Sequence, residues 1–399
     1  MGVTRQSDTA FDDAVVGAGI IGLAHAYHLA RAGQRVVVIE RAPQACGASI
    51  RNFGMIWPIG QPFGPMRLLA MRSREIWLDV LGRSGIWFDP CGSLHLAYHE
   101  DEARVLREFL DEAGNHGYEC ALEDPGQIGL RASSVVQSKL IGGMWSPTEI
   151  CVDPREVIAK LPGWLSQTYG VVFHYGETVT GHFSPYVRTG SRAIEAAHLW
   201  VCSGDEFHLL YPEVIQSLGL TRCKLQMMRT NPTRDGARIG PMLAAGSTLR
   251  HYKAFETCPS LPEVRKRFSS ELPDFDRFGI HVMTSQNGRD EVVLGDSHEY
   301  GQYVEPFNRE EIDSYILDYL KTFVDIPNLS IAQRWHGIYA KHPTEPYVIA
   351  NPDADTTIVT GLGGAGMTLS FGVAERIVLS SLSEAGVERH RQNVGERLQ

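Results

Sequence analysis

Three glycines near the amino end of the chain have the spacing of a dinucleotide-binding turn. Gly17, Gly19 and Gly22 form the pattern G-x-G-x-x-G, and Glu40 lies 18 positions after the last of them. The first glycine would permit a tight turn, the second would let a pyrophosphate approach the backbone, and the third would let a helix pack closely on a strand. Glu40 could accept hydrogen bonds from both hydroxyls of an adenosine ribose. The motif predicts a dinucleotide site contacted by Gly17, Gly19, Ile20, Ile21, Gly22 and Glu40, without deciding between FAD and NAD.

A second glycine-rich segment lies near the carboxyl end. Residues 361–368 (GLGGAGMT) follow a predicted strand at 356–360 and precede a predicted helix at 372–382. A two-domain NAD dehydrogenase does not need such a turn, whereas a flavoprotein does. Reduced flavin carries negative charge at its N1–C2 carbonyl edge, and a helix amino terminus can stabilise that charge. The alternative interpretation is a mobile loop before a last helix.

The first motif needs a strand before it and a helix after it. Residues 11–16 are predicted to form a short buried strand, 21–32 a helix that ends at Gly33, and 35–39 the next strand. The free N–H groups at the amino end of that helix would hold the phosphates. This context favours a dinucleotide site over a glycine-rich turn without a ligand.

Together with the two glycine turns, further segments resemble the family of D-amino-acid oxidase, glycine oxidase and sarcosine oxidase. The segments are Glu40-Arg41, 47–54 (GASIRNFG), 152–154 (VDP, opening a helix), 170–173 (GVVF, a strand) and 197–204 (AHLWVCSG, a strand ending in small residues). The resemblance runs through nearly the whole chain. It implies an α/β fold (α+β overall), in which a Rossmann-like FAD-binding domain is joined to a second, antiparallel-sheet substrate domain.

The resemblance also implies that both domains are discontinuous in sequence. The FAD-binding domain would consist of residues 1–80, 145–220 and 335–399, and the substrate-binding domain of residues 81–144 and 221–334. Within the second domain, the residue pattern predicts strands at 225–230, 249–255, 280–284 and 291–294, with Asn287-Gly288 as a hairpin turn between the last two.

FAD is the cofactor that the resemblance implies, and its contacts can be carried over residue by residue. Arg41 would join Glu40 at the adenosine diphosphate part, and Val179 would meet the adenine through its backbone. The other expected FAD contacts are Ala48, Ser49, Arg51, Asn52, Gly204, Gly363, Gly364, Ala365, Gly366, Met367 and Thr368.

Residues 333–343 (QRWHGIYAKHP) resemble the family strand that crosses beside the flavin, with two departures. Tyr339 stands where glycine oxidase-like members have an arginine that clamps the substrate carboxylate, and Gly337 stands where sarcosine oxidase-like members have a flavin-linked cysteine. The resemblance thus implies non-covalent FAD and argues against an ordinary α-amino acid held by that arginine. Alternation places Trp335, Gly337, Tyr339 and Lys341 on one face, as a pocket for an amine with an anionic end or as simple packing under the sheet.

Residues 49–62 (SIRNFGMIWPIGQP) resemble one branch of the family, which occurs in the setting of phosphonate breakdown. The resemblance implies 2-aminoethylphosphonate, or its N-methyl or hydroxy relative, as the substrate. A phosphonate has three acceptor oxygens and prefers several spread donors to one planar fork, which fits the missing arginine. The candidate substrate-binding residues are Arg51, Arg250, His251, Trp335, Tyr339 and Lys341.

The expected reaction is FAD-dependent oxidative deamination. Hydride from the carbon next to the amine would go to flavin N5, hydrolysis of the imine would give an aldehyde, and O2 or another acceptor would take the electrons. Because flavin does the electronic work, no catalytic side chain is assigned. Alternatives stay open: oxidation of glycine, sarcosine or a D-amino acid; oxidation of a 2-hydroxy acid with His251, His281 or His336 as base; or a non-catalytic nucleotide-sensing subunit.

Composition limits the partners. The formal net charge of −10 argues against nucleic acid, and no run reaches the roughly 18 apolar residues of a membrane helix. The seven cysteines are scattered, odd in number and never in C-x-x-C, which is typical of reduced cytosolic thiols. We therefore expect a cytoplasmic protein, with its oligomeric state open. No metal site is expected, because the pairs His25/His28 and His95/His99 are better explained as packed or exposed histidines.

Overall fold

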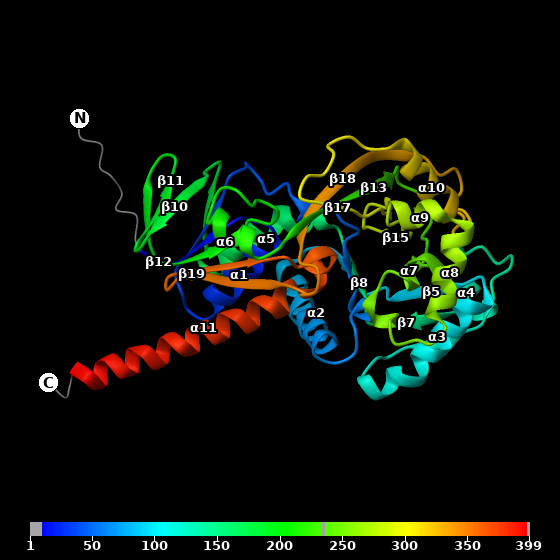
Figure 1. Cartoon of the computed structure of the whole chain (residues 1–399), viewed down its shortest axis with the longest axis horizontal. Coiled ribbons are helices and arrows are strands. Elements are labelled where there is room, and N and C mark those ends of the chain that lie inside the picture. The colour runs from blue at the N-terminus through cyan, green and yellow to red at the C-terminus, as the bar shows by residue number, and fades with distance from the viewer. Residues whose placement is uncertain (1–9, 234–235, 397–399) are drawn as a thin grey trace.

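Two large β-sheets organise the part of the chain that the computed structural model describes, residues 10–233 and 236–396 (Figure 1). Side chains of the last helix are described as far as residue 383. In Figure 1 the first sheet lies on the left and the second lies on the right. The predicted domain segments also contained residues 1–9, 234–235 and 397–399, which lie outside the described residues.

The first sheet has a parallel centre. Its strands, in spatial order, are β10 (Val179–Phe183), β11 (Tyr186–Thr189), β12 (Ala193–Val201), β1 (Phe11–Val16), β2 (Val36–Glu40) and β9 (Val172–Tyr175), with β20 (Thr356–Thr360) beside β12 and β19 (Val348–Asp353) beside β20. β1 pairs in parallel with β2 and β12, and β12 pairs in parallel with β20. The sequence segments that carry the two glycine turns thus enter one sheet from opposite ends of the chain.

Five helices of the described chain pack around the first sheet. They are α1 (Ile20–Arg31), α2 (Pro65–Ser84), α5 (Pro154–Tyr169), α6 (Pro212–Ser217) and α11 (Gly366–Glu396). Ten of the twelve residues of α1 are buried, because α1 packs against β1 and β2 and is itself contacted by α5 and α11. A helix that is apolar on all sides is the kind that a protein core holds.

The second sheet is antiparallel except where β14 pairs with β5. Its strands, in spatial order, are β17 (Glu299–Gly301), β13 (Thr221–Thr230), β16 (Val292–Gly295), β15 (Met283–Gln286), β14 (Met242–Ala244), β5 (Ser93–Ala97), β7 (Gly142–Ser146) and β6 (Ala121–Glu123), and β18 (Ile331–Lys341) pairs along β13. A small sheet of β3 (Met55–Ile56), β8 (Ile150–Val152) and β4 (Phe88–Asp89) accompanies the two large ones.

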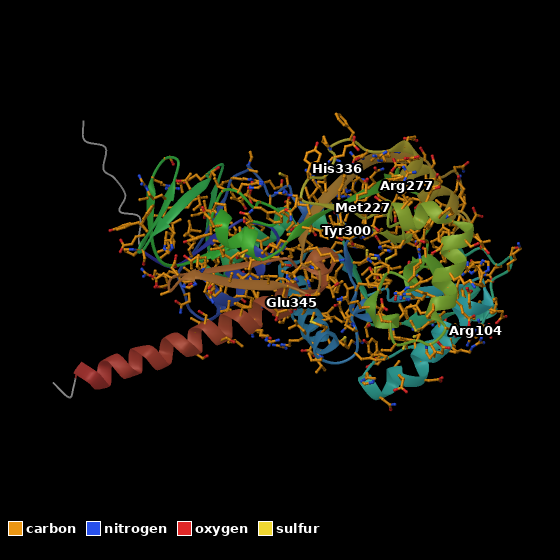
Figure 2. The ribbon with its side chains drawn as sticks, in the orientation of Figure 1. Arg104, Met227, Arg277, Tyr300, His336 and Glu345 are labelled. Atoms are coloured by element: carbon orange, nitrogen blue, oxygen red, sulfur yellow. The ribbon has the colours of Figure 1, made fainter. Side chains whose placement is uncertain are left out.

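The helices around the second sheet are α3 (Glu100–Ala113), α4 (Pro125–Arg131), α7 (Gly246–Leu249), α8 (Leu261–Glu271), α9 (Pro273–Arg277) and α10 (Glu310–Leu320). Figure 2 shows Met227 and Tyr300 near the junction of the two halves, whereas Arg104 lies on the far side of the second. Within the described ranges, helices that combine the length and the apolar character of a membrane span are absent.

The observed elements confirm the predicted fold class and most of the predicted strands. The predictions at 225–230 and 291–294 fall on β13 and β16, and Asn287-Gly288 lies in the turn of the β15–β16 hairpin. The predicted strand at 280–284 is shifted, because β15 begins only at Met283.

One predicted strand was wrong, and one predicted helix is present with a different start. Residues 249–255 form no strand: they run from the end of α7 through a loop into the short 3-10 helix η5 (Lys253–Phe255), where the neighbours Ala254 and Phe255 are both buried. The last helix begins at Gly366 rather than at residue 372, although glycine and threonine are poor helix formers. Packing against α1 and α2 outweighs that weak local preference.

The strands of the first sheet all come from the three segments predicted for the FAD-binding domain. β18 crosses the predicted boundary at residue 335 and pairs with β13 of the second sheet, and β7 crosses the one at residue 145. The division into domains stays a prediction: of its four boundaries these two lie inside strands, the one at residue 81 lies inside α2, and the one at residue 221 coincides with the start of β13.

Candidate functional site

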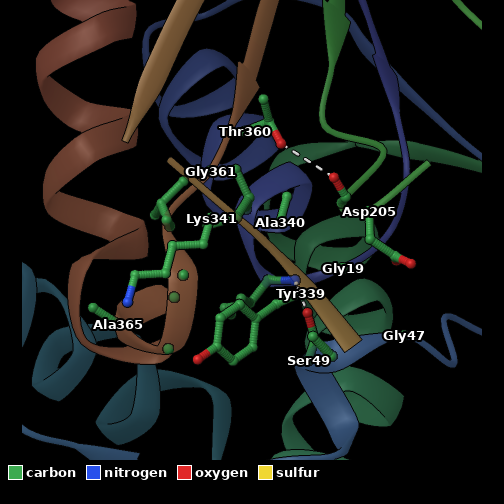
Figure 3. Close-up of a pocket in the computed structure, with 18 of the residues that line it drawn as sticks. Gly19, Gly47, Ser49, Asp205, Tyr339, Ala340, Lys341, Thr360, Gly361 and Ala365 are labelled. Atoms are coloured by element: carbon green, nitrogen blue, oxygen red, sulfur yellow. Dashed lines mark hydrogen bonds between the residues drawn. The ribbon is translucent and has the colours of Figure 1, made fainter. Parts of the chain in front are cut away.

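A cavity of about 790 Å3 brings the two glycine-rich turns together. Gly17 and Gly19 of the first turn line it, and so do residues 361–369 of the second. Figure 3 shows Tyr339 and Lys341 leaving their strand between the turn that carries Gly361 and Ala365 and the segment that carries Ser49. The fold therefore places the two glycine-rich turns, which are far apart in sequence, against one cavity large enough for a ligand.

Backbone geometry explains two glycines of the first turn. Gly17 has a φ of +97°, and a Cβ at this position would lie 2.6 Å from the carbonyl oxygen of Cys202. A Cβ on Gly22 would lie only 1.9 Å from the carbonyl oxygen of Gly17. Gly22 itself does not line the cavity, so its task is the close packing of α1 on β1 that the motif predicts.

Backbone amides hold the polar side chains of this turn in place. Glu40 Oε2 accepts a hydrogen bond from the amide of Ala18 at 2.9 Å, and Oε1 accepts one from the amide of Ala42 at 3.0 Å. Ser49 Oγ accepts a hydrogen bond from the amide of Ile20 at 2.9 Å. The carboxylate of Glu40 has further lone pairs, so it can still receive hydroxyl donors from a ligand.

The other residues predicted to contact FAD also line this cavity. Asn52 is fixed there by hydrogen bonds from Nδ2 to the carbonyl oxygens of Ala48 and Ser49, at 3.0 and 3.1 Å. Arg41 is held by an ion pair with Glu206 at 2.7 Å. The predicted residues in the lining are Gly17, Gly19, Ile20, Ile21, Glu40, Arg41, Ala48, Ser49, Arg51, Asn52, Val179, Gly204, Gly363, Gly364, Ala365, Gly366, Met367 and Thr368.

The second turn brings the amino end of a long helix to the cavity. Gly363–Ala365 form the 3-10 helix η6, and α11 follows directly from Gly366. Thr368 Oγ1 accepts a hydrogen bond from the amide of Trp57 at 2.9 Å, which ties this first turn to another part of the cavity wall. Because a helix amino end carries partial positive charge, this one would stabilise negative charge on a ligand beside it.

Strand β18 presents two of its three candidate substrate-binding side chains to this cavity, and Gly337 lines it as well. Tyr339 and Lys341 line it, whereas Trp335 lines a separate cavity of about 370 Å3. The division lies at Gly337, where a Cβ would be 3.0 Å from the carbonyl oxygen of Arg51. The segment that contains Arg51 thus crosses the strand at this glycine, and Arg51 lines both cavities.

Burial affects the protonation of both β18 side chains. It raises the pKa of Tyr339 well above its ordinary value, so the phenol keeps its proton. Burial lowers the pKa of Lys341, whose Nζ donates a hydrogen bond to Tyr300 Oη at 3.1 Å. Tyr339 Oη lies 3.5 Å from the position of a Cβ on Gly364. A neutral phenol and an amine therefore share the wall beside the second glycine turn.

Two other candidate residues lie away from the cavity lining. Arg250 makes an ion pair with Asp276 and donates a hydrogen bond to the carbonyl oxygen of Ile280 at 3.1 Å. His336, one of the possible bases, is half-buried outside this lining and is hydrogen-bonded to Asn308 Oδ1 at 2.9 Å. The structure therefore does not bring Arg250 or His336 together with Tyr339 and Lys341.

His251 does line the cavity. His281, Asp296 and His298 line it too, although the sequence did not predict them as binding residues. His281 Nε2 lies 3.0 Å from Asp296 Oδ1, and His298 Nδ1 is hydrogen-bonded to the carbonyl oxygen of Gly279 at 3.0 Å. Burial lowers the pKa of His298 to about 4 and that of His251 well below its ordinary value. All four titratable side chains line the cavity.

The signal that could have located these residues was the Asn287-Gly288 hairpin. Its register pairs Met283 with Gly295, so extending it by two positions sets His281 against the segment of Asp296 and His298. The backbones of His281 and Asp296 do bond to each other, at 3.2 and 2.8 Å.

Of the other histidines that the sequence raised, His99 is exposed at the start of α3, whereas His25, His28 and His95 are packed inside the two halves. Burial lowers the pKa of His25 and His28 to about 4 and that of His95 to about 3. His25 Nδ1 donates to the carbonyl oxygen of Ile21 at 2.8 Å. These side chains are neutral core groups at neutral pH.

A family comparison agrees with this geometry. The sequence model of the DAO family, described as FAD dependent oxidoreductase, matches residues 12–378. Since the match spans most of the chain, the chain belongs to this family. The predicted family, the FAD cofactor and the oxidoreductase class are thereby confirmed.

Individual relatives are more distant. The chain is similar to the bifunctional protein ThiO/ThiG of Nostoc sp., with 30% identity over 235 residues that make up 55% of this chain and 34% of that protein. It therefore spans about a third of that relative. It is 22% identical to a monomeric sarcosine oxidase of Bacillus sp., over 96% of this chain and 95% of that protein. The crystal structure of glycine oxidase from Geobacillus kaustophilus has the same fold, with a TM-score of 0.74, 19% identity and coverage of 94% and 95%.

The residues around the cavity fit FAD. The first turn has no side chain at Gly17 and Gly19, where a diphosphate would need room, and Glu40 is held ready beside it. The second turn places the amino end of α11 at the same cavity, where it could face an anionic flavin edge.

Proposed function

We propose that this protein uses FAD to oxidise a small primary or secondary amine that carries an anionic end. The proposed substrate is an aminophosphonate: 2-aminoethylphosphonate, or its N-methyl or hydroxy relative. The amine would become an imine, and water would hydrolyse the imine to an aldehyde with release of ammonia or methylamine. We further propose that the residues of the two glycine turns, with Glu40, Arg41, Val179 and the 48–52 segment, hold the cofactor.

One observation carries the substrate class. Tyr339 and Lys341 project from β18 into the cavity beside the second glycine turn, where the resembling glycine oxidases have an arginine clamp. A tyrosine and a lysine offer separate single donors, which suit a tetrahedral anion better than a planar carboxylate. Arg51 lines the same cavity and could add a third donor.

The side chains bind and orient rather than attack. FAD, when bound, accepts two electrons and a proton equivalent as hydride from the carbon next to the amine. Lys341 would hold the anionic end, and the protonated Tyr339 phenol would donate a hydrogen bond to it or to the amine nitrogen. The buried wall formed by Met227, Leu225 and Trp57 would keep bulk water away from the reacting carbon.

An anaerobic reduction screen tests this proposal. FAD-loaded protein is mixed with 2-aminoethylphosphonate, its N-methyl form, glycine, sarcosine, D-alanine and a 2-hydroxy acid, and the visible flavin bands are followed. We expect rapid bleaching by an aminophosphonate. Bleaching by glycine or sarcosine alone would replace the substrate, and bleaching by the hydroxy acid alone would replace the reaction. Flavin that is bound but reduced by none of these would favour a sensing subunit.

We also propose an electron acceptor and a cellular location for this protein. O2 or another acceptor would reoxidise the flavin, and a stopped-flow reoxidation with air would distinguish an oxidase from a dehydrogenase. All seven cysteines are unpaired, which supports a reducing compartment such as the cytoplasm.

A further inference from the structure

Three histidine rings meet in the cavity wall beyond Tyr339. The ring centroids of His251 and His281 are 3.8 Å apart, those of His251 and His298 are 4.5 Å apart, and those of His281 and His298 are 5.0 Å apart. The ring of His298 lies 6.5 Å from that of Tyr339. These three residues are called the histidine cluster (His251, His281 and His298). The cluster lies next to Tyr339, which itself lies beside the second glycine turn, and His281 and His298 have no role in the function proposed above.

The surroundings of the cluster fix one nitrogen of the His298 ring and leave one nitrogen of the His281 ring without a partner. His281 Nε2 lies 3.0 Å from Asp296 Oδ1, an oxygen that has no hydrogen-bond partner, and His281 Nδ1 is buried and also has none. His298 Nδ1 faces the carbonyl oxygen of Gly279, which can only accept, so Nε2 is the remaining nitrogen of that ring. The half-buried His251 ring makes ring contacts with both. The cluster thus offers ring nitrogens for a ligand in the cavity.

A metal ion is one ligand that three histidines could take. One nitrogen from each ring lies within 4.8 Å of the others, so their spacing alone does not exclude a metal ion. The rings are stacked or only moderately tilted, with interplanar angles of 22° to 42°. Rings that lie side by side present their edges in a row, which suits several oxygens of one anion better than convergence on a single ion.

Charge around the cluster points the same way. The ammonium of Lys341 contributes to the lowered pKa of both His251 and His298, so the cluster and this lysine share one electrostatic site. Asp296 lies 3.0 Å from His281 and 3.8 Å from His298, ready to stabilise a protonated ring. The other titratable or charged groups that face the cluster are Arg250, Tyr252, Tyr300 and Tyr339.

We infer that His251, His281 and His298, together with Lys341, bind the tetrahedral anionic end of the substrate, and that this binding takes up a proton from solution. The inference rests on the proposed function, because it assigns the anion of that substrate to a part of the same cavity. Burial and repulsion between the rings lower the pKa of His251 and His298 and so keep these two rings neutral. An anion in contact with the ring nitrogens reverses this preference, because an opposite charge nearby favours the protonated form.

Ethanesulfonate tests the inference without any turnover. It has three tetrahedral oxygens, lacks the amine, and keeps the same charge across the pH range, so any pH dependence belongs to the protein. FAD-loaded protein is treated with EDTA and titrated with ethanesulfonate between about pH 5.5 and 8.5, with the flavin spectrum as readout. We expect the affinity to fall by about tenfold or more as the pH rises, because proton uptake on binding is lost. Binding that does not depend on pH would overturn the inference.

Variants assign the effect to the cluster. The double variant His281→Asn, His298→Gln should bind ethanesulfonate about tenfold or more weakly and lose the pH dependence, because charge-assisted hydrogen bonds are lost. Lys341→Met should weaken binding and keep the pH dependence. His116→Gln, an exposed histidine outside the cavity lining, is the matched control. Flavin content and Tm show whether each variant has folded.

The outcomes separate this inference from the proposed function. If 2-aminoethylphosphonate reduces the flavin of the double variant as well as that of the wild type, the cluster is not the anion subsite, although the reaction stands. If ethanesulfonate binds with the expected pH dependence but no aminophosphonate reduces the flavin, the subsite stands and the reaction does not. One zinc ion retained per chain through EDTA treatment, or stoichiometric Zn2+ binding that the double variant loses, would replace the anion by a metal.

Discussion

The two ends of the cavity are built in different ways. At the cofactor end the backbone sets the shape: Gly17 and Gly22 allow contacts that no side chain would permit, and α11 begins at Gly366. At the other end side chains do so: His281 and His298 come from the segments that flank a hairpin, and His251 comes from a loop after α7. The first end is defined by local chain conformation, and the second by which distant loops the fold brings together.

This difference decides what each end reveals in the sequence. A tight turn before a helix requires glycines at fixed spacing, so it leaves a short pattern that can be read directly. Three histidines on separate loops have no fixed spacing, and only the register of the second sheet relates His281 to His298. The cofactor end of the cavity can thus be predicted from the sequence. The end that holds the three histidines becomes visible only in the structure.

The largest expected effect comes from filling the backbone-defined end. Gly22→Ala would place a Cβ 1.9 Å from the carbonyl oxygen of Gly17, so α1 must move away from β1. We expect loss of bound FAD and a loss of stability of about 3 kcal/mol or more. Flavin absorbance after purification and thermal unfolding measure the two effects.

Gly82→Ala is the matched control for that substitution. Gly82 lies within α2 with open space around its Cβ position, so alanine should bind FAD normally and stabilise the helix by up to about 1 kcal/mol. If Gly22→Ala retained FAD with wild-type stability, the backbone would not define the cofactor end, and the contrast between the two ends would fail.

The next effect concerns the charge at the side-chain-defined end. Lys341→Met should lower kcat/KM for an anionic amine by about 10- to 100-fold, because a charge-assisted hydrogen bond is lost. Burial lowers the pKa of Lys341 below 10.5, so the wild-type ammonium loses its proton, and its hold on the anion, as the pH rises through that lowered value. The pH profile of the wild type should have a descending alkaline limb that the variant lacks. Lys321→Met, on an exposed lysine, should leave the profile as it is.

A smaller effect is expected at Asp13, on the strand before the first glycine turn. It should change the stability of the protein and leave catalysis unchanged. Burial raises the pKa of Asp13 to about 6 from 3.8, while Trp200 Nε1 donates a hydrogen bond to its Oδ1 at 2.7 Å. A raised pKa means that the folded state holds the proton more tightly, so this contribution to stability is full below about pH 3.8 and is lost as the pH rises through about 6.

Asp13→Asn removes this dependence and keeps an acceptor for Trp200. We expect a gain of about 2 kcal/mol in unfolding free energy near pH 8 and little change near pH 4, with unchanged kcat/KM. Urea unfolding at the two pH values measures it. An equal change at both pH values would mean that ionisation of Asp13 is not the cause.

The fold could be predicted where local pattern and long-range packing agree. The strand, turn and helix around Gly17 were predicted because apolar runs and glycine spacing point to the same structure. The segment at 249–255 was predicted as a strand from its mixture of apolar and polar residues, although tertiary contacts bury the neighbours Ala254 and Phe255 together. Its failure also hid the loop that carries His251.

The same limit applies to strand β18. Alternation correctly predicted that Trp335 and Tyr339 leave the same side of the strand, but it could not show that the segment with Arg51 crosses between them at Gly337. A crossing by a segment almost 300 residues away in sequence leaves no mark in the alternation. The reason for a glycine at 337 is visible only once Arg51 is placed.

These two aromatic residues allow the smallest and sharpest test of the comparison. Tyr339→Phe removes a phenol that lines the main cavity, and kcat/KM for the amine should fall by about two- to tenfold, the value of one hydrogen bond. Trp335→Phe alters the smaller cavity and should change kcat/KM by less than about twofold. Steady-state kinetics on both variants, with flavin content as the check on folding, gives the ratio. Equal losses would mean that the crossing at Gly337 does not separate the two cavities in function, and the substrate would then have to extend under the segment of Arg51.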